Sequence, residues 1–142
     1  MRKYNVLGVS AGQGALLFPW KLAKHNIIGN VEPRAVFHTK KEEQWKGNFG
    51  SSLFTRNLEE VIDKKVDVIV SSPDCGASSI MRLSKVKQLG KPEKNKSLNL
   101  VLEAINHFKP KMFLLENLPR LLSLLPKTYF EESLPEYKLI YH

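Results

Sequence analysis

The sequence contains little cysteine, no long apolar run and no recognisable metal-ligand spacing. Its 142 residues include a single cysteine, Cys75, and four scattered histidines. One cysteine cannot form an internal disulfide, and these residues lack the spacing of a zinc site. No apolar run approaches the roughly 18 to 20 residues of a membrane-spanning helix, and the N-terminus, MRKYNVLGVS, lacks the pattern of a cleavable signal peptide. We therefore expect a cytoplasmic protein without a metal centre.

The composition indicates one globular domain with an excess of positive charge. With 42% hydrophobic residues, a chain of 142 residues is long enough to bury its own core, so residues 1–142 are expected to form one domain. The formal net charge of +8 favours a polyanionic partner such as nucleic acid without establishing one. Positive charge is densest between residues 82 and 96, where a solvated loop is the more common explanation. The basic residues there are Arg82, Lys85, Lys87, Lys91, Lys94 and Lys96.

Short apolar runs alternate with helical periodicity along the chain. Runs that suit buried strands occur at 4–9, 27–32, 52–55, 67–72 and 112–116. Helical patterns occur at 16–26, 33–45, 58–65, 97–108 and 117–126. Pro33 suits a first helical turn, and Asn117 suits the N-cap of the last predicted helix. The final residues, 137–142, predict a strand whose partners lie outside these residues.

This alternation predicts an α/β fold with a doubly wound, mostly parallel sheet. Strands that alternate with helices form parallel sheets, and right-handed crossovers place helices on both faces. In such sheets, ligands bind beyond the carboxyl ends of the strands, where the strand order reverses. The turn after the first strand, Glu32, the loop around Cys75 and Glu116 all fall at predicted strand ends. We therefore expect these segments to share one site.

The segment SAGQGA, which follows the first predicted strand, carries Gly12 and Gly14. Glycine lets the backbone approach a ligand closely, and the N-terminus of the next helix offers amide donors. Leu17 stands where a nicotinamide-type fingerprint needs a third glycine, so that interpretation is poor, and a simple strand-to-helix turn also explains the pair. However, Glu32 ends the second strand, where an acid holds ribose hydroxyls in nucleotide-binding folds. The combination favours a nucleoside site.

Cys75 lies in the loop SSPDCGASS after the strand at 67–72. A lone cysteine is by default a small buried hydrophobe. The neighbours of Cys75 are small and mostly polar, however, and cannot enclose it in apolar surface. A thiol facing the ligand crevice could act as a nucleophile, activated by nearby positive charge or a helix terminus. Pro73 would stiffen the loop that presents it.

Glu116 follows the apolar run MFLL and is therefore predicted to end a buried strand. A buried acid is costly unless it is hydrogen-bonded or has a function. Hydrogen bonds from loop amides to the carboxylate would explain an acid at this position about as well as a catalytic role would. A nucleophilic thiol and an acid beside a nucleoside site suit attack on an electron-poor ring whose nitrogen the acid protonates.

Taken together, these residues resemble the DNA cytosine-5 methyltransferase family. The turn VSAGQGA is similar to its Phe-x-Gly-x-Gly-Gly cofactor motif, and Glu32 to the acid that holds the ribose of S-adenosylmethionine. SSPDCG resembles the Pro-Cys nucleophile loop, and ENL at 116–118 resembles the Glu-Asn-Val motif. Motif order and spacing agree across nearly the whole chain. The resemblance implies the Rossmann-like fold of S-adenosylmethionine-dependent methyltransferases, incomplete at its C-terminal end.

The resemblance also implies a reaction, the methylation of C5 of a cytosine that is flipped out of double-stranded DNA. Cys75 would add to C6 of the base, and Glu116, next to Asn117 in the motif, would contact N3, while C5 takes the methyl group from S-adenosylmethionine. The implied cofactor-binding residues are Ser10, Ala11, Gly12, Gly14, Glu32, Asn57, Pro73 and Leu100. The implied DNA-contacting residues, in a segment that would close over DNA and contact phosphates, are Ser79, Arg82, Lys85 and Lys87.

The chain differs from the family pattern at several positions. Ser10 replaces an aromatic residue, Ala15 replaces a glycine, and Asp74 and Gly76 flank the cysteine where proline and glutamine are usual. Asn57 stands near the place of an aspartate that usually holds the adenine. The family's Gln-x-Arg-x-Arg segment, its target recognition domain and its last cofactor-contacting helix would all lie beyond residue 142.

Three interpretations stay open. The chain could be part of a cytosine methyltransferase of a restriction-modification system, with a second chain or further segment that supplies target recognition. It could instead be a catalytically degenerate remnant that binds nucleotide or nucleic acid. An amino-methyltransferase with an Asp-Pro-Pro-Tyr loop ranks last, because that loop needs an aromatic residue where Cys75 stands.

Overall fold

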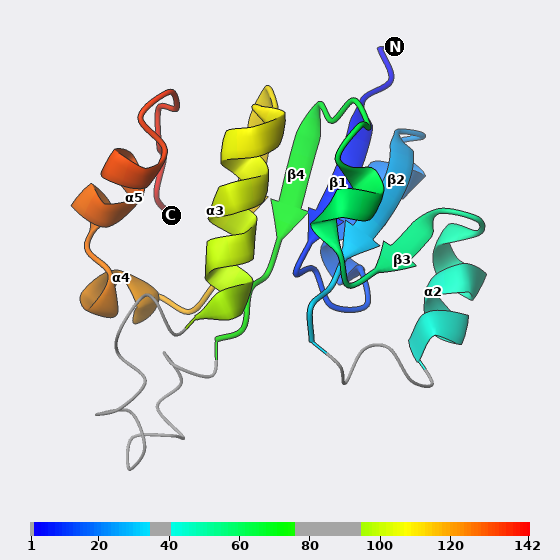
Figure 1. The fold of residues 1–142 in the computed structure, drawn as a ribbon, viewed down its shortest axis with the longest axis horizontal. Helices are drawn as coiled ribbons and strands as arrows, with labels where there is room; N and C mark the ends of the chain where they lie inside the picture. The colour runs from blue at the N-terminus through cyan, green and yellow to red at the C-terminus, as the bar shows by residue number, and fades with distance from the viewer. Residues whose placement is uncertain (1, 35–40, 76–94) are drawn as a thin grey trace.

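A computed structural model describes residues 2–34, 41–75 and 95–142 of the chain. The described residues form a five-stranded sheet in which every pair of neighbours is parallel (Figure 1). The strands are β1 (Asn5–Val9), β2 (Asn26–Val31), β3 (Leu53–Thr55), β4 (Val68–Ser71) and β5 (Met112–Leu115). Their order is β3-β2-β1-β4-β5, so the direction of winding reverses between β1 and β4. The predicted doubly wound α/β fold is confirmed.

Helical segments cover both faces of the sheet because alternate strand residues point in opposite directions. Leu7 of β1 packs in a cluster that includes Ile105, whereas its neighbour Val6 packs in a second cluster with Leu17 and Trp45. The first cluster is formed with α3 (Lys96–Phe108), α4 (Leu121–Leu124) and α5 (Lys127–Ser133). The second is formed with η1 (Ala15–Leu17), a 3₁₀ turn that leads into α1 (Phe18–Leu22), and with α2 (Lys41–Phe49).

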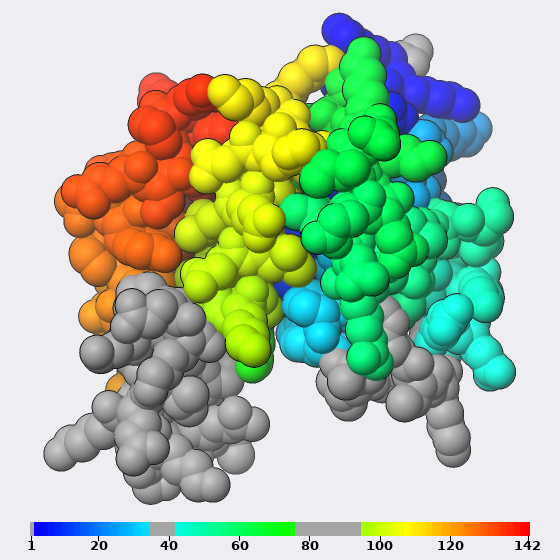
Figure 2. Space-filling view, viewed as in Figure 1, coloured from blue at the N-terminus to red at the C-terminus, as the bar shows by residue number. Residues whose placement is uncertain are grey.

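Helix α3 matches its prediction well and organises the layer in front of the sheet. The Asn95 side chain caps its N-terminus by accepting a hydrogen bond from the Leu98 N–H at 3.0 Å. The helix ends where Lys109 adopts a left-handed conformation. Beside it lies α5, in Figure 1 and in the space-filling view of the same face (Figure 2), and Asn106 donates to the Ser133 carbonyl at 3.1 Å.

Other predicted helices are shorter than the apolar spacing indicated. The pattern at 58–65 becomes the 3₁₀ turn η3 (Leu58–Val61). The predicted helix start at Pro33 is wrong: Pro33 and Arg34 are not helical, and the Arg34 side chain folds back onto Glu32. The predicted N-cap role of Asn117 is also wrong, because α4 begins at Leu121 and the Asn117 carboxamide hydrogen-bonds the Leu118 N–H and the Pro73 carbonyl instead.

Strand β5 forms the edge of the described sheet. The prediction that this strand is buried is wrong for two of its residues. Met112 is 48% exposed and Leu114 45%, whereas Phe113 and Leu115 pack on the first cluster. The predicted strand at 137–142 is not formed. Tyr137 reaches β5 through its side chain, with its ring edge-on to Phe113 and its hydroxyl donating to the Pro110 carbonyl at 2.8 Å. A hollow of about 790 Å³ lies between β5 and this C-terminal segment.

Within the described ranges, no helix is long and apolar enough to cross a membrane.

The amino ends of three strands are joined by the Asp67 carboxylate. Its Oδ2 accepts the Asn5 N–H at 3.0 Å, and its Oδ1 accepts the Lys111 ammonium at 2.8 Å. These two hydrogen bonds, that of Lys111 above all, hold the pKa of Asp67 below its ordinary value. The carboxylate therefore ties β1, β4 and the residue before β5 at the end of the sheet opposite the predicted site.

Asp67→Asn should lower the free energy of unfolding by about 1 kcal/mol at neutral pH, because the ion pair and a hydrogen bond are weakened. Since the folded-state pKa is depressed, this stabilisation is present above the unfolded-state pKa and is lost as the pH falls through the folded-state value. Urea unfolding of both proteins from neutral to strongly acid pH should therefore converge at the acid end. A difference that is independent of pH would contradict the role given to Asp67.

Candidate functional site

The turn after β1 adopts backbone conformations that favour glycine. Gly12 and Gly14 have φ of 61° and 86°, and Ser10 has φ of 53°. A Cβ added at Gly14 would lie 2.7 Å from the Phe49 ring and 2.8 Å from the Trp45 ring, so this position needs glycine for space as well. The Ser10 N–H donates to the Val31 carbonyl at 2.7 Å, so the turn starts while β1 is still joined to β2.

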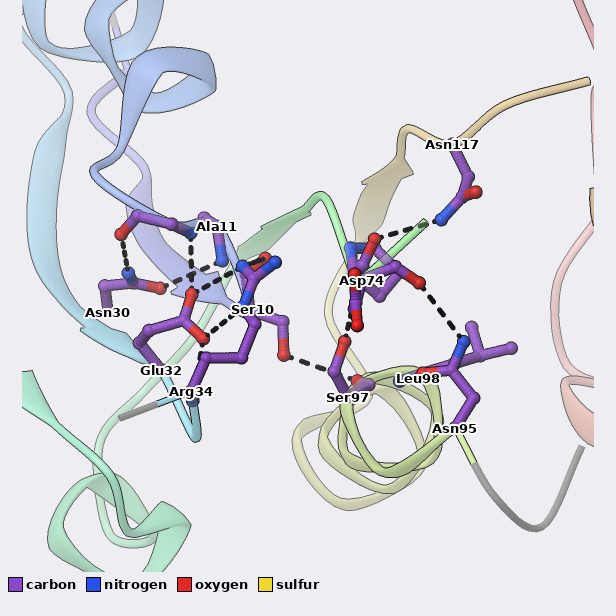
Figure 3. A network of polar contacts seen from close by, with 12 residues as sticks. Ser10, Ala11, Asn30, Glu32, Arg34, Asp74, Asn95, Ser97, Leu98 and Asn117 are labelled. Atoms are coloured by element: carbon purple, nitrogen blue, oxygen red, sulfur yellow. Dashed lines mark hydrogen bonds and ion pairs between the residues drawn. The ribbon is translucent and has the colours of Figure 1, made fainter. Parts of the chain in front are cut away.

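Asn30, which the sequence analysis did not single out, holds this turn in place. Its side chain is fully buried, donates to the Gly12 carbonyl at 2.9 Å and accepts the Ala11 N–H at 3.4 Å (Figure 3). A Cβ at Gly8, on the neighbouring strand, would lie 2.6 Å from the Asn30 Oδ1, so Gly8 leaves room for the amide. The only sequence signal was a polar residue inside an apolar strand, two positions before Glu32.

The Glu32 carboxylate lies at the carboxyl end of β2 and is fully buried. Its Oε2 accepts the Gly12 N–H at 2.8 Å, so the predicted turn and the predicted acid are in direct contact. The Arg34 side chain binds the same carboxylate with two N–H groups, Nε to Oε1 at 2.6 Å and Nη2 to Oε2 at 2.7 Å (Figure 3). Arg34 was not identified from the sequence, although an arginine two residues after an acid at a strand end is a potential ion pair.

The loop that carries Cys75 begins directly beside this turn. The Ser72 N–H donates to the Ser10 carbonyl at 3.3 Å, across the point where the winding reverses. Pro73 is buried, whereas Asp74 and Cys75 are exposed. The default interpretation of Cys75 as a buried hydrophobe is therefore wrong. The thiol lies at the surface, in the loop that follows the carboxyl end of β4.

The N-terminus of α3 holds the turn and the Cys75 loop together. The Ser97 hydroxyl accepts the Asp74 N–H at 2.7 Å, while the Ser97 carbonyl accepts the Ser10 hydroxyl at 3.3 Å (Figure 3). The Asn95 amide also donates to the Asp74 carbonyl at 3.4 Å. The loop thus lies at the positive end of the α3 dipole, which favours negative charge near it. Ser97 and Asn95 were not identified from the sequence.

Glu116 and Asn117 join the same loop from the side of β5. The Ser72 hydroxyl donates to the Glu116 Oε2 at 2.7 Å, and the Asn117 amide donates to the Pro73 carbonyl at 3.0 Å. Glu116 is exposed, so the expectation of a buried acid is wrong. The physical reason is that β5 is an edge strand whose end lacks a neighbour on its outer side within the described sheet. The Glu-Asn motif and the cysteine loop, which were expected to share one site, are nevertheless in contact.

Asn57 and Leu100 are the other predicted site residues that the structure describes. Asn57 follows β3 and is exposed, with its N–H donating to the Thr55 hydroxyl at 3.1 Å. Leu100 lies on α3 and packs against the first core cluster. The predicted DNA-contacting residues lie outside the described residues; they are Ser79, Arg82, Lys85 and Lys87. No cluster of three or more potential metal ligands occurs in the described part of the chain.

Comparison with known proteins points to methyltransferases. No protein-family model matches the chain. A type II methyltransferase of Bacillus paralicheniformis, M.Bpa9945I, is 32% identical over 72 residues, which are 50% of this chain and 16% of that protein. The chain is similar in sequence to a methyltransferase.

Solved structures extend the similarity to the fold. A DNMT2 mutant of Spodoptera frugiperda superposes with a TM-score of 0.63 and 22% identity, over 94% of this chain and 41% of that one. The methyltransferase EhMeth of Entamoeba histolytica superposes with a TM-score of 0.62 and 16% identity, over 96% of this chain and 44% of that one. The sequence similarity supports the predicted resemblance to a methyltransferase, and the superpositions confirm the predicted Rossmann-like fold. The chain spans less than half the length of each of these three proteins.

Gly8→Ala should lower the free energy of unfolding by roughly 1 to 3 kcal/mol, because the added methyl group overlaps the Asn30 amide and the Leu17 side chain. Gly47→Ala is a matched control, since a Cβ there meets no atom within 4 Å and Gly47 lies inside α2. The control should be neutral or slightly stabilising. Urea unfolding measures both changes, and equal effects would contradict the packing assigned to Gly8.

Proposed function

We propose that residues 1–142 form the cofactor-binding and nucleophile-bearing part of a DNA cytosine-5 methyltransferase. The observation that carries the proposal is the network of hydrogen bonds at the carboxyl edge of the sheet. It joins the β1 turn with Glu32, and the Cys75 loop with Glu116. This network supports a site in which nucleoside-binding groups, a thiol and a carboxylic acid would act together at the reversal point of an α/β sheet, where ligands of such folds bind.

S-adenosylmethionine would lie over the β1 turn. Glu32 would accept hydrogen bonds from the ribose hydroxyls. The backbone at Ser10, Ala11, Gly12 and Gly14 would follow the ligand closely because none of these four residues has a large side chain. Asn57, at the end of the neighbouring β3, would lie towards the adenine. Pro73 and Leu100 are further predicted contacts. Bound there, S-adenosylmethionine supplies an electrophilic methyl group.

The Cys75 thiolate would add to C6 of a flipped cytosine, while Glu116 donates a proton to N3 of the ring. The addition would leave an electron pair at C5, which would form the bond to the methyl group as the methyl–sulfur bond breaks and S-adenosylhomocysteine leaves. Loss of the C5 proton to solvent, breakage of the S–C6 bond and return of the N3 proton to the Glu116 carboxylate would then restore the aromatic ring, the free thiolate and the acid. Asn117 supports this arrangement by fixing the Pro73 carbonyl, and the Ser72 hydroxyl orients the Glu116 carboxylate.

Double-stranded DNA is the proposed partner, and the cytoplasm the proposed location. The net charge of +8 suits a polyanion, and the predicted contacts at Ser79, Arg82, Lys85 and Lys87 remain predictions. Target recognition would come from a second chain or a further segment. The incomplete coverage of the longer relatives and the exposed apolar residues of the β5 edge, Met112 and Leu114, support this.

Glu32→Gln should weaken binding of S-adenosylhomocysteine by roughly tenfold or more, because hydrogen bonds to a charged acceptor contribute about 1.5 to 3 kcal/mol each. Isothermal titration calorimetry measures the change. Glu103→Gln is the matched control, because Glu103 is exposed on α3 and its substitution removes the same charge. Circular dichroism establishes that the Glu32 variant is folded. Equal affinities of the two variants would exclude Glu32 from the cofactor site.

The Cys75 thiol should form a covalent adduct with mixed-sequence duplex DNA that contains 5-fluorocytosine, when S-adenosylmethionine is present. The fluorine blocks the loss of the C5 substituent, so the S–C6 bond persists and is detected by denaturing electrophoresis. Cys75→Ser should abolish the adduct without changing the affinity for S-adenosylhomocysteine. If the unmodified chain binds S-adenosylhomocysteine but yields no adduct, the alternative of a binding remnant gains support.

A further inference from the structure

The acceptor sites of the Glu32 carboxylate are already filled. A carboxylate offers about four lone-pair positions for hydrogen-bond donors. Oε1 accepts the Arg34 backbone N–H at 3.1 Å and its Nε at 2.6 Å, and Oε2 accepts the Gly12 N–H at 2.8 Å and the Arg34 Nη2 at 2.7 Å. Two donors are backbone amides of the turns on either side, and two belong to the Arg34 guanidinium.

A ribose cannot bind this carboxylate in the observed arrangement. Its two vicinal hydroxyls need two acceptor positions, and the four backbone and guanidinium donors leave none. The two backbone donors cannot leave, because the Gly12 N–H belongs to the turn after β1 and the Arg34 N–H to the chain that directly follows β2. The guanidinium is the group that can leave, because the Arg34 side chain is 24% exposed whereas the Glu32 side chain is 0% exposed.

We propose that the Arg34 side chain is an internal competitor for the cofactor at Glu32. This inference rests on the proposed function and adds a regulatory residue to it. In the free chain, the bidentate guanidinium neutralises the buried carboxylate and satisfies both oxygens. On binding, the two ribose hydroxyls replace Nε on Oε1 and Nη2 on Oε2, and the guanidinium moves into solvent. The two backbone hydrogen bonds are kept.

The displacement also reaches the turn after β1. The Arg34 Nη2 donates to the Ser10 carbonyl at 3.0 Å, and this carbonyl also accepts the Ser72 N–H of the cysteine loop. Departure of the guanidinium therefore removes one of two donors from the carbonyl that links the two halves of the site. Arg34 thus stabilises the free chain at the expense of cofactor affinity, since a competent state that is only partly populated lowers the apparent affinity in proportion.

The test compares Arg34→Met with the parent chain and with Arg2→Met, a control that removes one positive charge outside the site. S-adenosylhomocysteine is titrated by calorimetry, and the melting temperature is measured with and without it. Arg34→Met should bind about tenfold more tightly than the parent, while its ligand-free melting temperature falls because a buried carboxylate loses two donors. Saturating ligand should close most of this gap, and Arg2→Met should behave like the parent.

A second comparison keeps the inference testable if Arg34→Met fails to fold. Arg34→Lys keeps the charge but not the two-pronged geometry. Adenosine and 2′,3′-dideoxyadenosine are titrated into Arg34→Lys and the parent. The variant should improve the affinity for adenosine and leave that for the dideoxy compound unchanged, because only hydroxyls compete with the guanidinium.

The outcomes separate the inference from the proposed function. Weaker or equal binding by the Arg34 variants, with binding by the parent, would overturn the competitor role and leave the cofactor site intact. Binding by a variant but not by the parent would support the competitor role in its strongest form. Absence of binding by the parent and all variants would overturn both.

Discussion

The buried carboxylate of Glu32 is the constraint around which the site is arranged. A charged group without solvent exposure must receive hydrogen bonds and a countercharge. Those donors come from the Gly12 amide, which requires the turn after β1 to fold over β2, and from Arg34, which bends the chain back after β2. The positive φ at Gly12 and the hydrogen bond from the Asn30 amide to the Gly12 carbonyl keep the turn in the conformation that brings the Gly12 N–H to Glu32. A single acid thereby determines how two strand ends are joined.

Short polar side chains then connect this centre to the cysteine loop. Ser10, Ser72 and Ser97 reach only neighbouring groups, so each hydrogen bond draws two backbone segments close together. Ser97 bridges the β1 turn and Asp74 from the first turn of α3. The loop that presents Cys75 is therefore positioned by α3 and by the carboxyl ends of β1 and β5. Cys75 can therefore be exposed while the loop that carries it is held in a defined position.

The centre of the sheet and its β5 edge differ in how completely they are covered. Around β1 and β4, both faces are packed, by α3 on one side and by η1 and α2 on the other. At β5, Met112 and Leu114 are exposed, and the C-terminal segment touches the strand through Tyr137 rather than by a ladder of backbone hydrogen bonds. The nucleoside side of the site thus lies in the well-packed half of the domain. The acid side, with Glu116, lies at its open edge.

The sequence by itself determined the strand positions, the α/β class, the glycine turn and the meeting of Glu32 with Gly12. These follow from local periodicity, glycine conformation and the rule that parallel strands end at one edge. Only the tertiary structure decided that β5 is an edge, that Glu116 is exposed, that residues 137–142 form no strand and that Asn117 binds the cysteine loop instead of capping a helix. Burial and partner choice depend on neighbours distant in sequence, and Asn30, Arg34 and Ser97 acquire their roles in the same way.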